Sequence, residues 1–162
     1  MKKLLVVSDT HGNTQVFQKI IQGEPEAEAL IFLGDCAEDV EYVKAHIRRR
    51  LPAYVVRGNC DIDSPYPAEG LAAFEGTLIF YTHGHLYDAR GGPSKLSEVA
   101  AQRGADCALC GHTHVPDEFR AGPIPVFNPG SPSRPRSFMG PTYGLLTLER
   151  GQEPQFEIKQ IL

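Results

Sequence analysis

Five short segments of the chain carry the side chains that can bind metal ions, and each follows a hydrophobic run. The segments are Asp9-Thr10-His11, Gly34-Asp35, Gly58-Asn59-Cys60-Asp61, His83-Gly84-His85 and Gly111-His112-Thr113-His114. Five of the six histidines lie in them. Imidazole and carboxylate groups are common protein ligands of divalent metal ions. The sequence therefore indicates a metalloenzyme.

The number of donor groups favours two metal ions over one. Asp9 and His11 are two residues apart, as are His112 and His114, so each pair can point into one cavity from a short extended segment. With Asp61 set aside as a residue that orients its loop, the segments offer two carboxylates, one amide oxygen and four or five imidazoles. A tetrahedral zinc ion takes about four ligands, and a catalytic zinc takes only about three of them from the protein.

Hydrophobic patterning predicts that the first three segments follow the strands of a parallel sheet. Residues 3–7, 29–33 and 53–56 are apolar runs typical of buried strands, and apolar residues recur at helical spacing between them. The inward positions are Val16, Phe17, Ile20 and Ile21 in one helix and Val40, Val43 and Ile47 in the next. This alternation implies right-handed βαβ units.

The second half of the chain has a different pattern. Strands are predicted over 77–81 and 106–110, a helix over 96–103, and short antiparallel strands over 126–127, 143–148 and 156–161. Six of the 13 prolines lie between Pro123 and Pro141, which fits a rigid surface loop that also forms a wall of the site. We expect a single α/β domain over residues 1–162, with two packed β-sheets flanked by helices.

Composition excludes several classes of partner. The net charge of −4 and the pI near 5.8 argue against an extended nucleic-acid surface, and Arg48-Arg49-Arg50 is interpreted as the solvated end of a helix. The first apolar run ends before Ser8, short of the ~7–15 residues of a signal peptide, and no run approaches the roughly 20 residues of a membrane span. We expect a cytoplasmic protein that does not contact membranes, and the sequence leaves a homo-oligomer open.

The C-x-x-C pair formed by Cys107 and Cys110 lies within a predicted strand. Residues three apart on a strand point to opposite faces, so the two thiols cannot easily share a metal ion. We interpret both as small core residues.

The order of the metal-binding segments closely resembles the signature of the calcineurin-like metallophosphoesterase superfamily. The pattern D-x-H, G-D, G-N-x-D, H and G-H-x-H runs from Asp9 to His114. Four segments look like the YfcE-type branch of small bacterial and archaeal phosphodiesterases: Ser8-Asp9-Thr10-His11-Gly12-Asn13, Gly58-Asn59-Cys60-Asp61, Thr82-His83-Gly84-His85-Leu86 and Asn128-Pro129-Gly130-Ser131. The resemblance implies the α-β-β-α fold of that superfamily and a metal-dependent phosphodiesterase.

The resemblance also implies a ligand set. It assigns Asp9, His11, Asp35 and His114 to a first metal ion, and Asp35, Asn59, His83 and His112 to a second. Asp35 would bridge the two ions, and a hydroxide between them would attack the phosphorus. Two divalent ions more than balance the two carboxylates, which suits an anionic substrate. Imidazole ligands favour Mn²⁺, Fe²⁺, Ni²⁺, Co²⁺ or Zn²⁺ over Mg²⁺ and Ca²⁺, and Mn²⁺ is our first choice.

Cys60 is a departure from much of the superfamily, which carries a histidine in the G-N-H-D position. A thiol with a pKa of about 8.5 is a poor proton donor compared with an imidazolium. The YfcE-type branch shares this cysteine, so we count Asn59 and Cys60 among the catalytic residues. His85 is the candidate replacement acid, and a hydrogen-bonding role beside the ligands is the equal alternative for it.

Candidate phosphate contacts are chosen by their proximity to the motifs. They are Asn13, Asn128 and Arg134, with Arg90 and Arg136 also considered. For the three arginines, a solvated surface position is the competing interpretation. Asp61 is expected to orient its loop and not to bind metal.

The substrate is expected to be a small phosphodiester, with two alternatives. One is a phosphomonoesterase or protein phosphatase on the same scaffold. The other is a non-catalytic interaction module of the retromer-subunit type, against which the complete ligand set argues. Cys36 and Cys60 have no basic group to activate them, so covalent catalysis is disfavoured.

Overall fold

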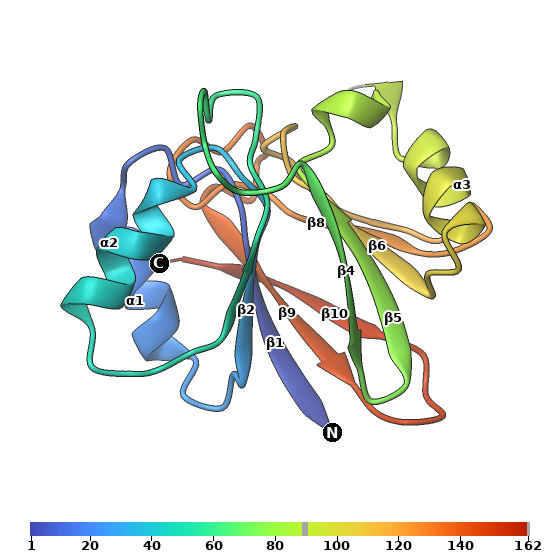
Figure 1. Cartoon of the computed structure of the whole chain (residues 1–162), viewed down its shortest axis with the longest axis horizontal. Helices are drawn as coiled ribbons and strands as arrows, with labels where there is room; N and C mark the ends of the chain where they lie inside the picture. The colour runs from blue at the N-terminus through green and yellow to red at the C-terminus, as the bar shows by residue number, and fades with distance from the viewer. Residues whose placement is uncertain (89–90, 162) are drawn as a thin grey trace.

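The computed structural model describes residues 1–88 and 91–161. Two five-stranded mixed sheets pack face to face, and helices cover their outer faces (Figure 1). This arrangement confirms the predicted α/β fold class, a two-sheet β-sandwich flanked by helices.

The first sheet has the strand order β10-β9-β1-β2-β3. Its strands are β1 (Lys2–Val7), β2 (Ala29–Phe32), β3 (Ala53–Val55), β9 (Thr142–Leu148) and β10 (Gln155–Gln160), and its helices are α1 (Thr14–Gly23) and α2 (Glu38–His46). Strands β1, β2 and β3 are parallel, as predicted, whereas β9 and β10 are antiparallel to their neighbours.

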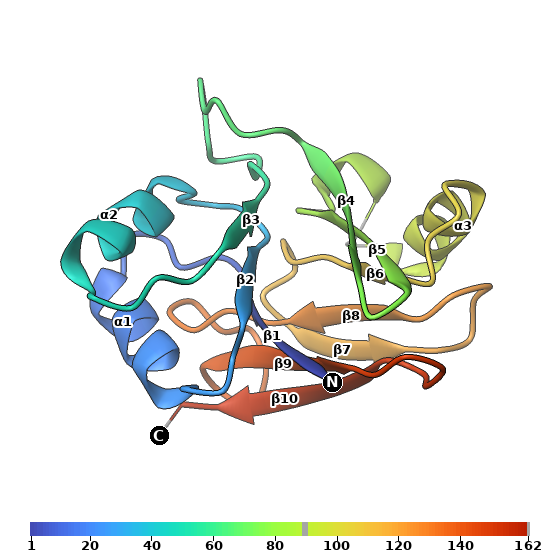
Figure 2. The ribbon, with the colours of Figure 1, turned by 60° about the horizontal axis from the view of Figure 1, so that its bottom comes forward.

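The second sheet has the order β4-β5-β6-β8-β7. Its elements are β4 (Glu69–Phe74), β5 (Thr77–Thr82), the short 3₁₀ helix η1 (His85–Tyr87), α3 (Ser94–Gln102), β6 (Cys107–Leu109), β7 (Pro116–Phe119) and β8 (Val126–Pro129). The segment that joins β3 to β4 carries the chain from one sheet to the other and projects beyond the strands (Figure 2).

Two features of the second sheet differ from the sequence prediction. Strand β8 was expected to be antiparallel, but it pairs in parallel with β6 and antiparallel only with β7. After β6 the chain forms the edge strand β7. It then turns back as β8, which lies between β6 and β7. Strands β4 and β7 were not predicted, because β4 is rich in Gly and Ala and β7 contains a proline and two acidic residues.

The side chains of β1 point alternately into two hydrophobic cores. Leu4 and Val6 lie in the core between the two sheets, whereas Leu5 and Val7 lie in the core beneath α1 and α2. Burying an aliphatic side chain of this size contributes about 1.5–3 kcal/mol. These strands therefore provide a rigid support for the loops at their ends.

The cysteine pair behaves as predicted. Cys107 lies in the core between the sheets, and Cys110 lies in the separate core beneath α3. Both are buried free thiols.

The expectation for the arginine run is confirmed only in part: Arg48 and Arg50 are exposed, but the run lies beyond the helix and Arg49 is partly buried. Helix α2 ends at His46, before the arginines, and the guanidinium of Arg49 donates hydrogen bonds to the carbonyls of Ile21, Glu24, Pro25 and Ala27. Arg49 thus holds the end of α1 and the turn that follows it.

No helix in the described part of the chain is long and apolar enough to cross a membrane.

Candidate metal centre

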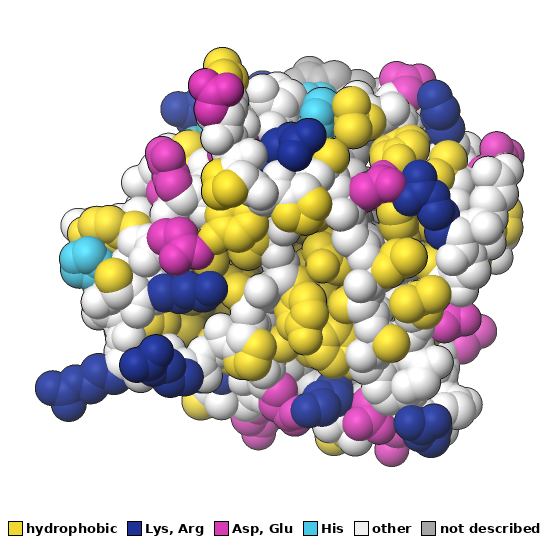
Figure 3. Space-filling view, viewed as in Figure 1, with side chains coloured by type: hydrophobic (Ala, Val, Ile, Leu, Met, Phe, Trp, Pro, Cys, Tyr) yellow, Lys and Arg dark blue, Asp and Glu magenta, His cyan; other side chains and the backbone are white. Residues whose placement is uncertain are grey.

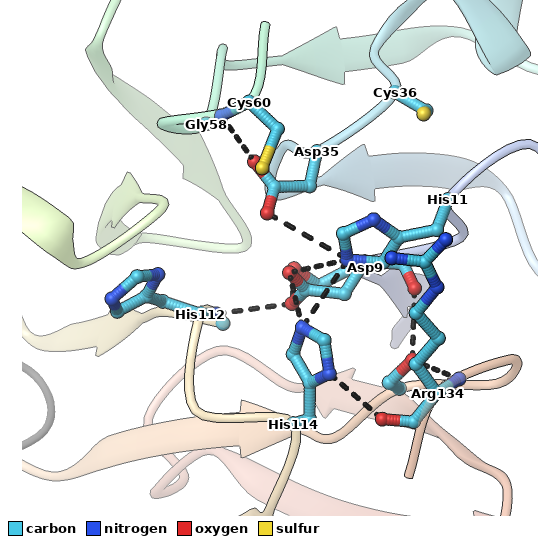
Figure 4. Close-up of polar contacts among 12 residues, drawn as sticks. Asp9, His11, Asp35, Cys36, Gly58, Cys60, His112, His114 and Arg134 are labelled. Carbon is cyan, nitrogen blue, oxygen red and sulfur yellow. Dashed lines mark hydrogen bonds and ion pairs between the residues drawn. The ribbon is translucent and has the colours of Figure 1, made fainter.

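All five metal-binding segments lie at the carboxyl ends of strands. They follow β1, β2, β3, β5 and β6, and the two sheets bring these strand ends to one edge of the molecule. Figure 4 shows side chains from four of the segments converging there. Ligand sites of α/β proteins commonly lie at this edge, where loops can vary above a rigid sheet.

The first group of donors is Asp9, His11, Asp35 and His114, whose ligand atoms all lie within 4.8 Å of one another. The His114 Nε2 atom is 3.3 Å from Asp9 Oδ1 and 3.2 Å from His11 Nε2. The His11 Nε2 atom is 3.7 Å from Asp35 Oδ2. This is the group that the sequence assigned to the first metal ion.

A second group adjoins the first through Asp35. The His83 Nε2 atom lies 3.5 Å from Asp35 Oδ2, 3.1 Å from Asn59 Oδ1 and 3.3 Å from His112 Nδ1. The same Oδ2 atom of Asp35 therefore lies near His11, from the first group, and near His83, from the second. The structure thus brings all seven predicted ligands together.

One oxygen of Asp9 is available to bind a metal ion. Its Oδ2 accepts hydrogen bonds from the Ser8 hydroxyl at 2.6 Å and from the backbone N–H of His112 at 3.0 Å. Its Oδ1 is buried and has no hydrogen-bond partner. Leaving a buried carboxylate oxygen unpaired costs at least about 1–3 kcal/mol. A metal ion between Oδ1 and the imidazoles would remove that cost.

Two histidines have their ring orientation fixed by backbone carbonyls. The Nδ1 of His83 is 2.6 Å from the carbonyl oxygen of Leu33, and the Nδ1 of His114 is 2.7 Å from that of Arg134. Because a carbonyl only accepts, each Nδ1 carries the proton, and in the neutral ring the Nε2 lone pair is left facing the carboxylates. Metal-bound histidines are typically held in this way.

The electrostatics keep both carboxylates ionised. Burial acts to raise the pKa of Asp9, but the imidazoles of His11, His114 and His83 outweigh it and lower that pKa. The pKa of Asp35 is also lowered, since His83 and the N–H of Cys60 outweigh the effect of burial. Ionised carboxylates are the form that binds a metal ion.

Five predicted ligands have an unusual backbone conformation. Asp9, His11, Asp35, His112 and His114 all have positive φ angles, between 47° and 71°. Asp and His tolerate this left-handed region better than most residues, but each instance costs on the order of 1–3 kcal/mol. Such strain is characteristic of functional sites, and it turns these side chains inward from the tips of tight loops.

Asp61 holds the second and third loops together, consistent with its predicted orienting role. Its carboxylate accepts hydrogen bonds from the backbone N–H groups of Asp35, Cys36, Ala37 and Gly58, at 2.7–3.0 Å. Through these bonds, Asp61 fixes the backbone that carries Asp35.

The close approach of the same two loops depends on Gly58. A Cβ atom at this position would lie 2.2 Å from Asp35 Oδ1 and 2.6 Å from the Asp35 backbone nitrogen. We expect Gly58→Ala to displace Asp35 and to lower metal content and activity, by about 10²-fold for a displacement near 1 Å. Metal analysis and kinetics would measure this. Gly23→Ala is the control, because a Cβ there meets no atom within 4 Å, and equal behaviour of the two variants would contradict the prediction.

The predicted phosphate contacts occupy different positions. Asn13 caps α1 by accepting a hydrogen bond from the N–H of Val16. Asn128 is buried and donates to the carbonyl of Gly111 and the hydroxyl of Thr113, both at 3.0 Å, so it braces the loop between His112 and His114. Both amides are therefore engaged by the chain itself.

Arg134 and Arg136 are exposed. The backbone of Arg134 is joined to the site through His114, and its side chain extends in the direction of His11 in the view of Figure 4. Arg136 joins the same loop to the site, since its backbone N–H donates to the carbonyl of His114. Arg90 lies outside the described residues.

Cys60 and His85 border the second group of donors. Cys60 is exposed, and burial together with the charge of Asp35 raises the pKa of its thiol. The pKa of His85 is lowered by burial and by His83, and its Nδ1 atom is buried without a hydrogen-bond partner. The ring centroid of His85 is 5.4 Å from that of His83. Cys36 has a pKa raised to about 11, so neither thiol near the site is an activated nucleophile.

Three further residues position the first loop and were not assigned this role from the sequence. The buried carboxylate of Asp39 accepts hydrogen bonds from the Thr10 hydroxyl and the Gly12 N–H. The hydroxyls of Ser131 and Ser133 donate to the carbonyl of Asp9. The asparagine–proline–glycine–serine segment that ends at Ser131 was a signal for one of them, whereas Asp39 has the sequence context of an ordinary helix residue.

Comparison with known proteins gives a consistent picture. Residues 1–151 match the calcineurin-like phosphoesterase superfamily domain. The chain is 32% identical over 148 residues to the probable metallophosphoesterase YsnB of Bacillus subtilis strain 168, covering 90% of this chain and 84% of YsnB. It is also 32% identical over 171 residues to phosphodiesterase YfcE of Escherichia coli K12, covering 90% of this chain and 88% of YfcE.

Solved structures share the fold. A predicted phosphoesterase from Streptococcus pneumoniae TIGR4 superposes with a TM-score of 0.74 at 25% identity, over 98% of both chains. Zinc-bound Vps29 from Entamoeba histolytica gives a TM-score of 0.75 at 20% identity, over 98% of both chains, a likeness of fold alone. The family match over residues 1–151 and the relatives at 32% identity, together with the Asp and His cluster, show that this chain belongs to the calcineurin-like phosphoesterase superfamily.

Proposed function

We propose that this protein hydrolyses small phosphodiesters with two divalent transition-metal ions, with Mn²⁺ as the first candidate. Asp9, His11, Asp35 and His114 would hold one ion, and Asp35, Asn59, His83 and His112 the other. The observation that carries the proposal is the Oδ2 atom of Asp35, which lies 3.7 Å from Nε2 of His11 and 3.5 Å from Nε2 of His83, one donor of each proposed set.

When bound, two divalent ions lower the pKa of water and neutralise charge on an attacked phosphate. The chain supplies the geometry for this chemistry. Asp61, Asp39 and Asn128 fix the loops before any substrate arrives, so little reorganisation is required on binding. Arg134 offers an exposed cation at the wall of the site, where it can contact an anionic substrate.

Two features support a diester substrate over a monoester. The relative YfcE is a phosphodiesterase, and 90% of this chain aligns with it. Cys60 offers an uncharged thiol where a histidine could have added positive charge for the second negative charge of a monoester. Phosphomonoester or phosphoprotein hydrolysis remains the alternative that a substrate comparison tests.

A non-catalytic interaction module is the alternative that the Vps29 likeness raises. The seven predicted ligands lie together in this chain, which supports catalysis. Because one Vps29 structure also contains zinc, a hydrolysis assay is what distinguishes the two functions. The backbone strain at five of these ligands is also unnecessary for an interaction module.

Metal removal tests the proposed function directly. EDTA is expected to abolish hydrolysis of bis(p-nitrophenyl) phosphate, and added Mn²⁺ is expected to restore it, because the metal ions would both lower the pKa of the attacking water and neutralise charge on the phosphate. Activity would be measured in parallel on p-nitrophenyl phosphate, a monoester. Undiminished turnover by protein shown to be metal-free would contradict the proposal. Faster turnover of the monoester would favour the phosphomonoesterase alternative.

A further inference from the structure

A cavity of about 560 Å³ opens beside the metal centre, between the start of α2 and the segment that joins β3 to β4. Its volume falls within the roughly 300–1,000 Å³ of small-molecule sites. Cys36, Cys60 and Asp61, which belong to or directly follow the metal-binding segments, are among its lining residues. The N–H of Cys60 donates to Asp35 Oδ1 at 3.0 Å, so one lining residue of the cavity contacts the Asp35 carboxylate directly.

The outer part of this cavity combines two kinds of surface. One is apolar and is formed by Ile62, Pro65 and Tyr66, of which Ile62 is 85% exposed. A large aliphatic side chain at that exposure gains nothing from the fold and is available to a ligand. The other is acidic and is formed by Glu38, Glu41 and Asp63; acidic side chains over α2 and the β3–β4 segment are visible in Figure 3.

The charges of this lining are not balanced within the cavity. No lysine or arginine is among its lining residues. Glu41 shares its charge with Lys44, 3.8 Å away, and accepts a hydrogen bond from the Tyr66 hydroxyl. Asp61 is occupied by backbone N–H groups. The guanidinium of Arg57 donates a hydrogen bond to the backbone carbonyl of the lining residue Tyr66. The carboxylates of Glu38, Glu41 and Asp63 outnumber the two neighbouring cations, Lys44 and Arg57, so the lining disfavours an anionic group.

We infer that this cavity holds one organic group of the phosphodiester and selects a cationic or uncharged group, such as an amino alcohol, over an anionic one. The inference rests on the proposed phosphodiesterase function. The position and shape of the cavity make it a site, and its carboxylates decide only the charge of the occupant. Ile62 and Tyr66 would contact the carbon atoms of that group, and a cation beside an aromatic ring gains further attraction.

The test uses three p-nitrophenyl phosphodiesters that share a leaving group and differ in the retained group, which is choline, ethyl or 2-carboxyethyl. With the Mn²⁺-loaded protein, kcat/KM is expected to be at least about tenfold higher for the choline ester than for the carboxyethyl ester, a difference of about 1.4 kcal/mol. The double variant Glu38→Gln/Asp63→Asn should bring this ratio close to one. Glu98→Gln, which removes an exposed carboxylate from α3, should leave the ratio as it is.

A second measurement does not depend on any variant. Raising the salt concentration toward 1 M shortens the screening length to about 3 Å and should compress the ratio in the unmodified protein. Equal kcat/KM for the three esters, or a ratio that survives the double substitution, would overturn the inference while leaving the phosphodiesterase function intact. Failure to hydrolyse any of the three esters would instead overturn the proposed function.

Discussion

Asp35→Asn is expected to lower kcat/KM by at least about 10³-fold and to reduce the metal content below two ions per chain. A metal ion contributes several kcal/mol to charge stabilisation, and about 4 kcal/mol corresponds to 10³-fold in rate. The asparagine keeps an oxygen that can accept the Cys60 N–H, so the loop should retain its conformation. Metal analysis and kinetics on the bis(p-nitrophenyl) ester would measure the two effects.

Single-ion variants provide the comparison. His11→Gln and His112→Gln each remove a proposed ligand of a single ion, so each should weaken one ion and cost less activity than Asp35→Asn. The charge of Asp35 is shared between the groups, with Nε2 of His11 at 3.7 Å and Nε2 of His83 at 3.5 Å. If Asp35→Asn retained two ions and near-normal turnover, the bridging assignment would be wrong.

The rate of the unmodified protein is expected to depend steeply on the leaving group. General acid catalysis contributes about 10²–10⁴-fold, and the thiol of Cys60, with its raised pKa, is a weak proton donor. Nitrophenyl and phosphoryl leaving groups should therefore be released well, and simple alkoxides poorly. A series of diesters with graded leaving-group pKa would give the slope.

Substitutions at Cys60 separate proton donation from packing. Cys60→His should flatten the slope and improve monoester cleavage, since the exposed position leaves room for the ring, whereas Cys60→Ser should change little. His85→Ala should steepen the slope without loss of metal if His85 is the acid. The lowered pKa of His85 instead favours its role as a neighbour of the ligands. A flat series in the unmodified protein would refute the argument from Cys60.

The sequence was sufficient for features that depend on local pattern. The continuous apolar runs over residues 3–7 and 29–33 predicted strands β1 and β2, and the polar residues after them predicted where the site lies. The opposite orientation of Cys107 and Cys110 followed from the two-residue period of a strand alone. The motif order then indicated the superfamily, which the family match confirmed.

Other features were decided only by the tertiary structure, because they depend on contacts between distant segments. The N–H of His112 meets Asp9 across 103 residues of sequence, and Ser131 meets the Asp9 carbonyl across 122. The parallel pairing of β8 depends on β7 forming the sheet edge, and the position of Arg49 depends on carbonyls left free at the end of α1. Local pattern identifies which side chains are available, whereas the left-handed loop conformations that turn five of the predicted ligands toward a common centre are maintained by packing and hydrogen bonds between loops.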